Sequence, residues 1–333
     1  MKKKSLLLML GFTFSGFVAA QSGVTRDTYV YSVKGADTLH MDVYVDHSPK
    51  FKEEKRPVMI YIHGGAWSAG SRKNAAQEVF NRHFAELGCL SVSIDYRLGL
   101  AEGNTYGLKS MEEIVRIGNE DLIDATNFIL SKEKEWNIDP KTVMLSGGSA
   151  GAINSLTIEY DICNDAAYTK RLPDGFNYAG IISQAGCIEM KTDTLIWNKK
   201  PCPMLLFHGT NDGALPVDKG GLMGSTWAGT KYIHRQLAEM DVPHWTFIEK
   251  GADHVIAMKC LTDNNTETDA FFHKFIKEKN KSIVYTEWAD KEPKGMASVD
   301  EMIKYAPLYI LGFGKYLEEL DFNNIEKPKG IVY

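Results

Sequence analysis

This sequence lacks the cysteine patterns that hold structural metals or a disulfide framework. Its 333 residues include five cysteines, an odd number, and no two of them form a C-x-x-C pair. That usage excludes the common zinc sites and a densely cross-linked scaffold. One disulfide remains open, with Cys187 and Cys202 as the first choice because they bracket a single short insertion, although sequence alone does not fix connectivity.

A sustained basic run is also missing. The formal net charge is −5, and the lysines at positions 52 and 55 flank two glutamates. Mixed charge of this kind is typical of a solvated surface and argues against nucleic acid as a partner. The sequence contains no internal repeat or low-complexity linker either.

Apolar runs long enough to span a bilayer are absent as well. The most apolar stretch lies at the N-terminus, where three lysines precede residues 6–18 and small residues follow up to Ala20. This order is typical of a secretory signal, residues 1–20, cleaved near Ala20; an N-terminal strand or anchor is the alternative. No later segment approaches the roughly 20 apolar residues of a membrane helix. We therefore expect a secreted or periplasmic protein without membrane contact after signal removal.

The sequence pattern of residues 21–333 predicts a single α/β domain. The chain is 44% hydrophobic and can bury one large core. Residues 28–33 and 39–45 alternate as a β-hairpin does. Six short apolar runs follow, at residues 57–62, 90–94, 142–145, 178–183, 204–207 and 245–248. Helix-like segments lie at residues 74–87, 112–134, 230–240 and 266–279. Strands buried on both faces and separated by helices indicate a mostly parallel sheet, and residues from about 280 to 333 form a C-terminal extension.

The sequence Gly147-Gly148-Ser149-Ala150-Gly151 lies between a strand-like run and a helix-compatible one. A G-x-S-x-G pattern at such a junction predicts a nucleophile elbow, because small neighbours let the strand and helix backbones approach while the serine hydroxyl projects outward. Alone the pattern is weak, since glycine and serine are common in turns.

Two later loops can supply the partners that a serine nucleophile needs. A serine hydroxyl requires a base, and that base requires an acid that fixes its tautomer. Asp212 follows the strand-like run 204–207, and His254 follows the run 245–248. Because functional groups gather at the carboxyl ends of parallel strands, Ser149, Asp212 and His254 are predicted to meet. Their chain order is that of the α/β-hydrolase fold.

Other residues compete for these roles. Asp253 and Glu249 are the alternatives to the acid, and His208 and His63 are the alternatives to the base. We expect the two histidines to brace loops instead.

An oxyanion hole is predicted in the segment H-G-G-A-W at residues 63–67, which follows a strand. Two adjacent glycines free the backbone to turn its N–H groups inward. The expected donors are the N–H groups of Gly65, Ala66 and Ala150.

These motifs, together with D-Y-R-L at residues 95–98, resemble the carboxylesterase and hormone-sensitive-lipase-like branch of the α/β-hydrolases, including bacterial acetyl xylan and feruloyl esterases. The resemblance covers roughly residues 39–277. It implies helices on both faces of the sheet, acylation of Ser149, proton transfer by His254 and orientation of that ring by Asp212. It implies no metal and no organic cofactor.

The chain departs from that branch in two places. It has H-G-G-A-W where H-G-G-G is usual, and it lacks the long N-terminal cap. Little or no cap domain is therefore expected, with the stretch 187–200 as the only obvious insertion between the run 178–183 and the run 204–207 that precedes Asp212. An open cleft favours a solvent-accessible acyl group on a bulky substrate.

The remaining interpretations are less specific. Asp95 and Arg97 are expected to form a buried pair. Trp67, Tyr106 and Trp227 are candidates for stacking on a sugar or aromatic acyl group, with ordinary packing as the alternative.

Three functions stay open at this level. The first is a secreted serine carboxylesterase that deacylates plant polysaccharide or its oligosaccharides, with acetyl and feruloyl esters as leading candidates by family analogy. The second is a serine peptidase of the same fold, and the third is a catalytically silent binding module.

Overall fold

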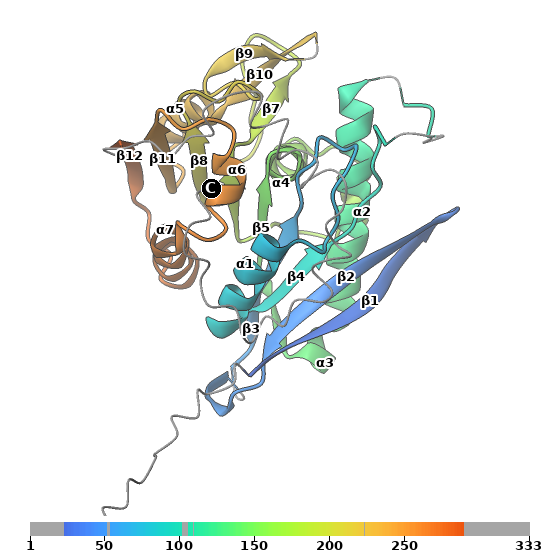
Figure 1. Cartoon of the computed structure of the whole chain (residues 1–333). Helices are drawn as coiled ribbons and strands as arrows, with labels where there is room; N and C mark the ends of the chain where they lie inside the picture. The colour runs from blue at the N-terminus through green and yellow to red at the C-terminus, as the bar shows by residue number, and fades with distance from the viewer. Residues whose placement is uncertain (1–22, 52–53, 102–105, 109, 223, 290–333) are drawn as a thin grey trace, which may run out of the picture.

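A nine-stranded sheet forms the centre of the molecule (Figure 1). This computed structural model describes residues 23–289 except 52–53, 102–105, 109 and 223. The strand order is β1-β2-β4-β3-β5-β6-β8-β11-β12. The pairs β1/β2 and β2/β4 are antiparallel, and every further pair along the sheet, from β4/β3 to β11/β12, is parallel. The predicted signal and most of the predicted C-terminal extension lie outside the described residues.

The strands of this sheet are β1 (Val24–Lys34), β2 (Asp37–Asp46), β3 (Arg56–Ile62), β4 (Leu90–Ile94), β5 (Ile138–Gly148), β6 (Gly180–Gln184), β8 (Met204–Gly209), β11 (His244–Lys250) and β12 (Ile283–Ala289). A small second sheet, in the order β7-β10-β9, consists of β7 (Cys187–Met190), β10 (Ser225–Gly229) and β9 (Lys219–Leu222). The helices are α1 (Ala75–Glu86), α2 (Met111–Ser131), α3 (Glu133–Trp136), α4 (Ala150–Cys163), α5 (Thr230–Glu239), α6 (Ile256–Lys259) and α7 (Asn265–Ala270). Short 3₁₀ turns, η1 (Pro49–Phe51) and η2 (Ala167–Arg171), and a π-helical turn, η3 (Phe271–Lys277), complete the described elements.

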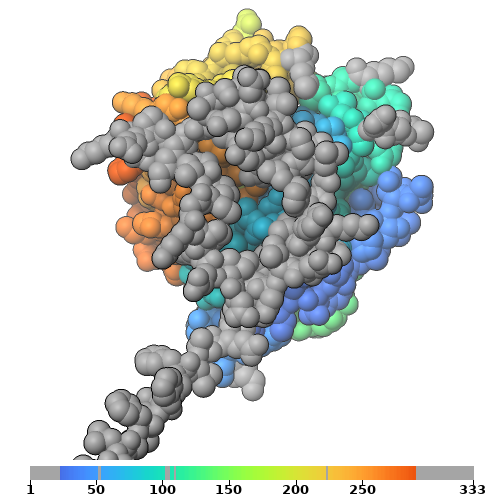
Figure 2. Space-filling model, viewed as in Figure 1, coloured from blue at the N-terminus to red at the C-terminus, as the bar shows by residue number. Residues whose placement is uncertain are grey.

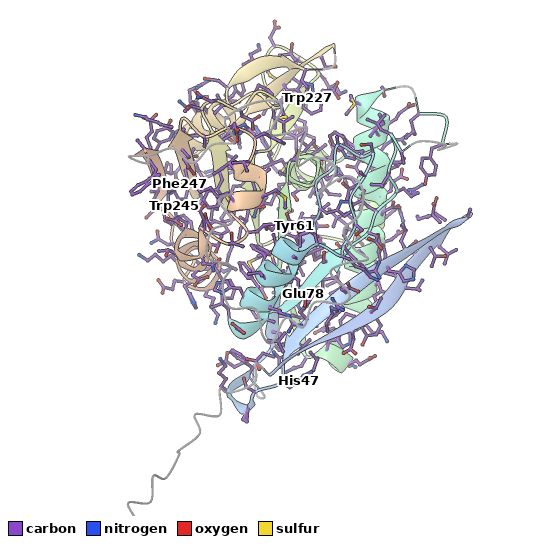
Figure 3. All side chains as sticks on the ribbon, viewed as in Figure 1. His47, Tyr61, Glu78, Trp227, Trp245 and Phe247 are labelled. Atoms are coloured by element: carbon purple, nitrogen blue, oxygen red, sulfur yellow. The ribbon has the colours of Figure 1, made fainter. Side chains whose placement is uncertain are left out.

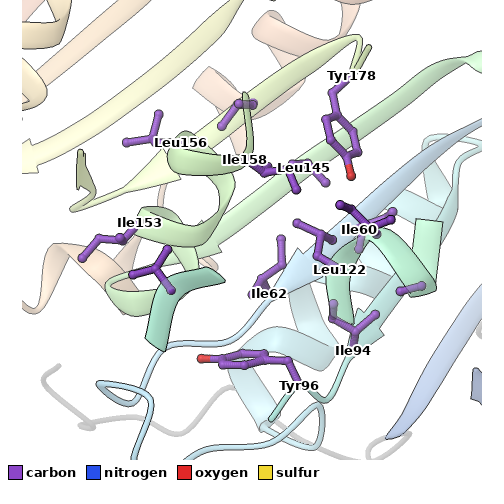
Figure 4. Close-up of a cluster of buried hydrophobic side chains, with 14 of the residues drawn as sticks. Ile60, Ile62, Ile94, Tyr96, Leu122, Leu145, Ile153, Leu156, Ile158 and Tyr178 are labelled. Carbon is purple, nitrogen blue, oxygen red and sulfur yellow. The ribbon is translucent and has the colours of Figure 1, made fainter. Parts of the chain in front are cut away.

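Both faces of the central sheet are buried, as the continuous apolar runs predicted. In β3, Ile60 and Ile62 face one hydrophobic cluster, while Met59 and Tyr61 face the other. Such alternation follows from the period of two along a strand. Helices α2, α4 and α5 cover the first face, part of which Figure 4 shows. Helices α1 and α6, with η3, cover the second (Figure 1).

The structure contains two features that the sequence pattern did not reveal. Strand β12 pairs in parallel with β11, and its side chains are largely exposed although several of them are apolar. The small sheet joins the insertion that begins at Cys187 to a second segment, residues 219–229. That segment, yellow in Figure 2, forms the upper rim of the face shown there. The second segment follows the loop of Asp212, outside the interval to which the prediction of one insertion applied.

The disulfide that the sequence left open is absent among the described residues. All five cysteines are buried free thiols. Cys187 begins β7 and pairs with Gly229, whereas the backbone N–H of Cys202 donates to Glu159 Oε1 of α4 at 2.7 Å. The two residues contact different elements. Their positions at the two ends of one insertion therefore did not bring them together.

The expected pair between Asp95 and Arg97 is also wrong, because each residue has another partner. Asp95 accepts hydrogen bonds from the backbone and the guanidinium of Arg72. Arg97 lies against Asp121 of α2, with Nη2 2.9 Å from Oδ1. A spacing of two residues places side chains on one face only within a strand, and β4 ends at Ile94, before both residues.

No helix in the described ranges is long and apolar enough to cross a bilayer.

Two histidines join α5 to the sheet. His244 Nε2 lies 2.8 Å from His234 Nδ1, and the His234 ring also packs on Tyr285 of β12. Burial, followed by the neighbouring His244 and Arg235, lowers the pKa of His234 to about 4. The ring is therefore neutral in the folded protein under conditions in which an unfolded histidine binds a proton.

Acidification from pH 6.5 to pH 4 is expected to lower the free energy of unfolding. In that interval the unfolded chain binds a proton that folded His234 does not, so stability is present above the unfolded pKa and is lost as the pH falls. His234→Gln should reduce this loss by less than about 1 kcal/mol, since the ring is partly exposed. Urea unfolding at several pH values measures it. The exposed His273→Gln variant is the matched control, and an unchanged slope in His234→Gln would contradict the interpretation.

Candidate active site

Ser149 occupies the sharp turn between β5 and α4, as predicted. Its backbone angles, a φ of +53° and a ψ of −119°, lie in a region that residues other than glycine rarely adopt. Such a conformation costs on the order of 1–3 kcal/mol and persists where the surroundings enforce it. Here the Ser149 N–H donates to Gln184 O of β6 at 2.9 Å. The hydroxyl is thereby presented at the carboxyl end of the sheet.

Gly151 allows α4 to approach β3 at this turn. A Cβ at position 151 would lie 2.0 Å from Ile62 O and 2.8 Å from His63 O. Both atoms belong to the backbone, so no flexible side chain can move aside. The sharp turn at Ser149 therefore requires a residue without a side chain at position 151.

The structure brings the three predicted side chains together in series. His254 Nε2 is 2.8 Å from Ser149 Oγ, and His254 Nδ1 is 2.8 Å from Asp212 Oδ2. Asp212 lies in the loop after β8 and His254 in the loop after β11, so each strand delivers one group to the same edge. The Asp212 side chain is fully buried, and 17% of the His254 side chain is exposed.

Hydrogen bonds hold Asp212 as an anion despite its burial. Its Oδ1 accepts the backbone N–H groups of Ala214 and Leu215, each at 2.9 Å. His208 Nε2 lies 3.2 Å from Oδ2, the oxygen that also contacts His254. Burial alone would raise the pKa of Asp212, but the contacts with His208, His254 and Leu215 hold it well below its usual value. The carboxylate can therefore orient Nδ1–H of His254 and leave Nε2 facing the hydroxyl.

The competing residues are engaged elsewhere. Asp253 Oδ1 accepts the N–H of Val255, and Glu249 Oε1 contacts Lys259 Nζ at 2.5 Å. The two alternatives to the base, His63 and His208, do brace loops, as expected.

The ring of His63 bonds to Gly64 O through Nδ1 and stacks on Tyr96. His208 Nδ1 bonds to Thr230 Oγ1 of α5 at 2.9 Å. His208 thus also contacts the acid, which sequence reasoning did not foresee. Its position at the end of β8, four residues before Asp212, was the only available signal.

The segment of residues 63–67 lies beside the serine. A Cβ on Gly64 would be 3.3 Å from Ser149 Cβ. Gly65 and Ala66 are exposed and have φ of +113° and +52°. Within the described residues, no oxygen accepts the backbone N–H of Gly65, Ala66 or Ala150. Ala150 begins α4, where N–H groups are unpaired and the helix dipole favours negative charge.

The three residues considered for substrate stacking are committed to internal contacts. Trp67 is 4% exposed, and its Nε1 donates to Asn154 Oδ1 of α4 at 2.7 Å. Trp227 is fully buried in the small sheet, where its Nε1 donates to Leu222 O. The Tyr106 hydroxyl donates to Asp37 Oδ2 at the hairpin turn. The two indole rings are thus unavailable to a substrate in this conformation.

Asn154 is a further residue of the site that sequence reasoning missed. The signal was a polar residue within the otherwise apolar first half of α4.

No cluster of three or more metal-ligating side chains occurs in the part of the chain that the structure describes. The arrangement instead suits nucleophilic chemistry. A hydroxyl faces an imidazole, the imidazole faces a buried carboxylate, and unpaired N–H groups lie beside the hydroxyl.

Sequence comparisons point to ester hydrolases. The model of the family described as BD-FAE matches residues 41–195. Gut esterase 1 of Caenorhabditis elegans is 26% identical over 226 residues, which are 65% of this chain and 34% of that protein. Neutral cholesterol ester hydrolase 1 of Mus musculus is 30% identical over 148 residues, which are 44% of this chain and 33% of that protein. The chain thus spans about a third of the length of these two relatives.

Among solved structures, native esterase 2 of Thermogutta terrifontis is similar, with a TM-score of 0.56 and 18% identity. The match covers 75% of this chain and 92% of that chain. A likeness at this identity concerns the fold.

Gly151→Ala is expected to destabilise the protein by about 3 kcal/mol or more, because the new Cβ would overlap backbone atoms on β3. Urea denaturation measures the change. Gly221→Ala is the matched control, since its Cβ would meet only Ser225 O at 4.0 Å. Equal stability of the two variants would show that α4 does not approach β3 as closely as described.

Proposed function

We propose that this chain, which belongs to the hormone-sensitive-lipase-like carboxylesterase branch of the α/β-hydrolase superfamily, hydrolyses carboxylic esters with Ser149 as nucleophile. The motif resemblance to that branch is confirmed by the family match and the esterase relatives. The observation that carries the proposal is the continuous series Ser149 Oγ, His254 and Asp212, with both contacts at 2.8 Å.

The proposed reaction has two halves. His254 Nε2 accepts the proton of Ser149 as Oγ attacks the ester carbonyl, and Asp212 stabilises the resulting imidazolium. The carbonyl oxygen becomes negative and receives hydrogen bonds from the N–H groups of Gly65, Ala66 and Ala150. His254 then protonates the leaving alcohol, and an acyl group remains on Ser149. Water, deprotonated by His254, attacks this acyl-enzyme, and His254 returns that proton to Ser149 Oγ as the acid is released.

The substrate class is the finer part of the proposal. We propose a short or solvent-accessible acyl group, such as acetyl or feruloyl, on plant polysaccharide or its oligosaccharides. Esterase 2 of Thermogutta terrifontis has been solved with propionate and with butyrate bound, which supports testing short acyl chains first. The N-terminal sequence supports export, after which such polymers would be accessible. This choice of polymer rests on family analogy.

Ser149→Ala is expected to remove nearly all hydrolysis of nitrophenyl acetate, because no other hydroxyl lies against His254 Nε2 among the described contacts. Ser131→Ala, which removes an exposed hydroxyl at the end of α2, is the matched control. Full activity in Ser149→Ala would contradict the assignment of the nucleophile.

Asp212→Asn is expected to lower kcat by about 10⁴, because the amide does not hold Nδ1–H of His254 in place. Initial-rate kinetics on the folded variant measure this loss. A decrease of less than tenfold would mean that Asp212 does not control the tautomer of His254.

A substrate screen separates the proposal from its alternatives. Nitrophenyl esters of increasing chain length, methyl ferulate and acetylated xylan test the acyl group and the alcohol, and a dipeptide anilide tests peptidase activity. A fluorophosphonate probe tests the nucleophile independently; the esterase from Thermogutta terrifontis has been solved phosphorylated by paraoxon. Faster cleavage of the anilide would favour a peptidase, and a protein that the probe does not label would favour the silent module.

A further inference from the structure

Three consecutive residues in the oxyanion segment have left-handed backbone conformations. Gly65 has a φ of +113°, Ala66 of +52° and Trp67 of +54°. Glycine adopts such angles freely, but Ala66 and Trp67 each pay about 1–2 kcal/mol. Consecutive strained residues persist only when surrounding contacts over-determine them. The contacts of Trp67 therefore decide whether this segment keeps its shape.

Trp67 is anchored at both its backbone and its side chain. Its carbonyl oxygen accepts the N–H of Leu100 at 2.8 Å, and its Nε1–H donates to Asn154 Oδ1 at 2.7 Å. Trp67 is 4% exposed and Asn154 is fully buried, so water does not compete for the second bond. The amide of Asn154 is oriented in turn, with Nδ2 3.4 Å from Val115 O of α2.

Asn154 belongs to the same helix as the third oxyanion donor. Helix α4 begins at Ala150, directly after Ser149, and Asn154 lies little more than one turn further on. A bond from Trp67 to Asn154 thus ties the loop that carries two N–H donors to the helix that carries the third donor and follows the nucleophile.

We propose that Trp67 and Asn154 are positioning residues, whose buried hydrogen bond fixes the N–H groups of Gly65 and Ala66 relative to Ser149. The inference rests on the proposed function, since it concerns the oxyanion of that reaction. It also reassigns Trp67 from substrate stacking to support of the oxyanion segment.

Loss of the bond has a specific kinetic consequence. Negative charge on the carbonyl oxygen develops only in the transition state, so misplaced donors lower kcat and leave KM nearly unchanged. Removing one donor outright costs about 10²–10³ in rate. Since Trp67→Phe loosens the donors without removing them, we expect kcat to fall about 10- to 100-fold, as displacements of about 1 Å do elsewhere.

The first test compares two tryptophan variants with wild type, using nitrophenyl butyrate. Trp67→Phe keeps an aromatic ring and loses the N–H. Trp245→Phe loses a comparable bond, from Nε1 to Thr286 Oγ1 at 3.0 Å, near the start of β11, at the end of the strand opposite to the one that leads to His254 (Figure 3). We expect kcat to fall only in Trp67→Phe, with KM within about twofold in both variants. Wild-type kcat in Trp67→Phe, or an equal loss in Trp245→Phe, would overturn the proposal.

The second test removes the acceptor and does not depend on how Trp67→Phe folds. Asn154→Ala leaves the indole intact, and it should lower kcat to a similar extent. The double variant should lose little more than the worse single variant, because both changes break one bond. Losses that multiply would mean that the two residues act separately.

A third measurement needs no catalysis. Hydrogen–deuterium exchange of the peptide containing residues 64–69 should be about tenfold faster in Trp67→Phe and Asn154→Ala than in wild type, and unchanged in Trp245→Phe. Equal exchange in all four proteins would overturn the positioning role even if wild type hydrolyses esters. Faster exchange in these variants of a protein that hydrolyses no ester would contradict the proposed function. It would still support the role of the bond between Trp67 and Asn154 in holding the segment.

Discussion

The site depends on the close approach of two backbones, the first turn of α4 and the end of β3. Gly151 permits this approach, since any Cβ there would overlap Ile62 O. The chain that leaves β3 becomes the segment with Gly65 and Ala66, and the chain that enters α4 carries Ser149. One backbone contact therefore sets the separation between Ser149 and two N–H groups. The hydrogen bond from Trp67 to Asn154 adds a second tie between the same two elements.

The electrostatics of the site follow from how Asp212 is buried. A carboxylate without exposed surface would ordinarily be neutral, but two backbone N–H groups and two histidines surround this one. Its charge is satisfied within the protein and does not vary with nearby solvent. His254 is thereby held in one orientation, with one nitrogen toward the acid and the other toward Ser149.

Sequence predicted the features that follow from chain order and period. Continuous apolar runs identified the parallel strands, and the rule that functional groups gather at carboxyl strand ends selected Asp212 and His254. Prediction from the sequence failed where the partner of a residue depends on the direction in which its side chain points. Trp67 is adjacent to the oxyanion donors yet turns inward to Asn154, and Asp95 pairs with Arg72, 23 positions away. β12 escaped detection because it is an exposed edge strand that interrupts its apolar residues with Thr286 and Glu287, unlike the buried runs used to identify the other strands.

The spacing of the three side chains along the chain has a consequence for biosynthesis. Ser149 and His254 are 105 positions apart, and Asp212 and His254 are 42 apart. Their contacts close long loops, so they form only after β5, β8 and β11 have taken their places in the sheet. In a nascent or half-folded chain, Ser149 therefore lacks its contact with His254. The serine becomes reactive only after these strands have assembled.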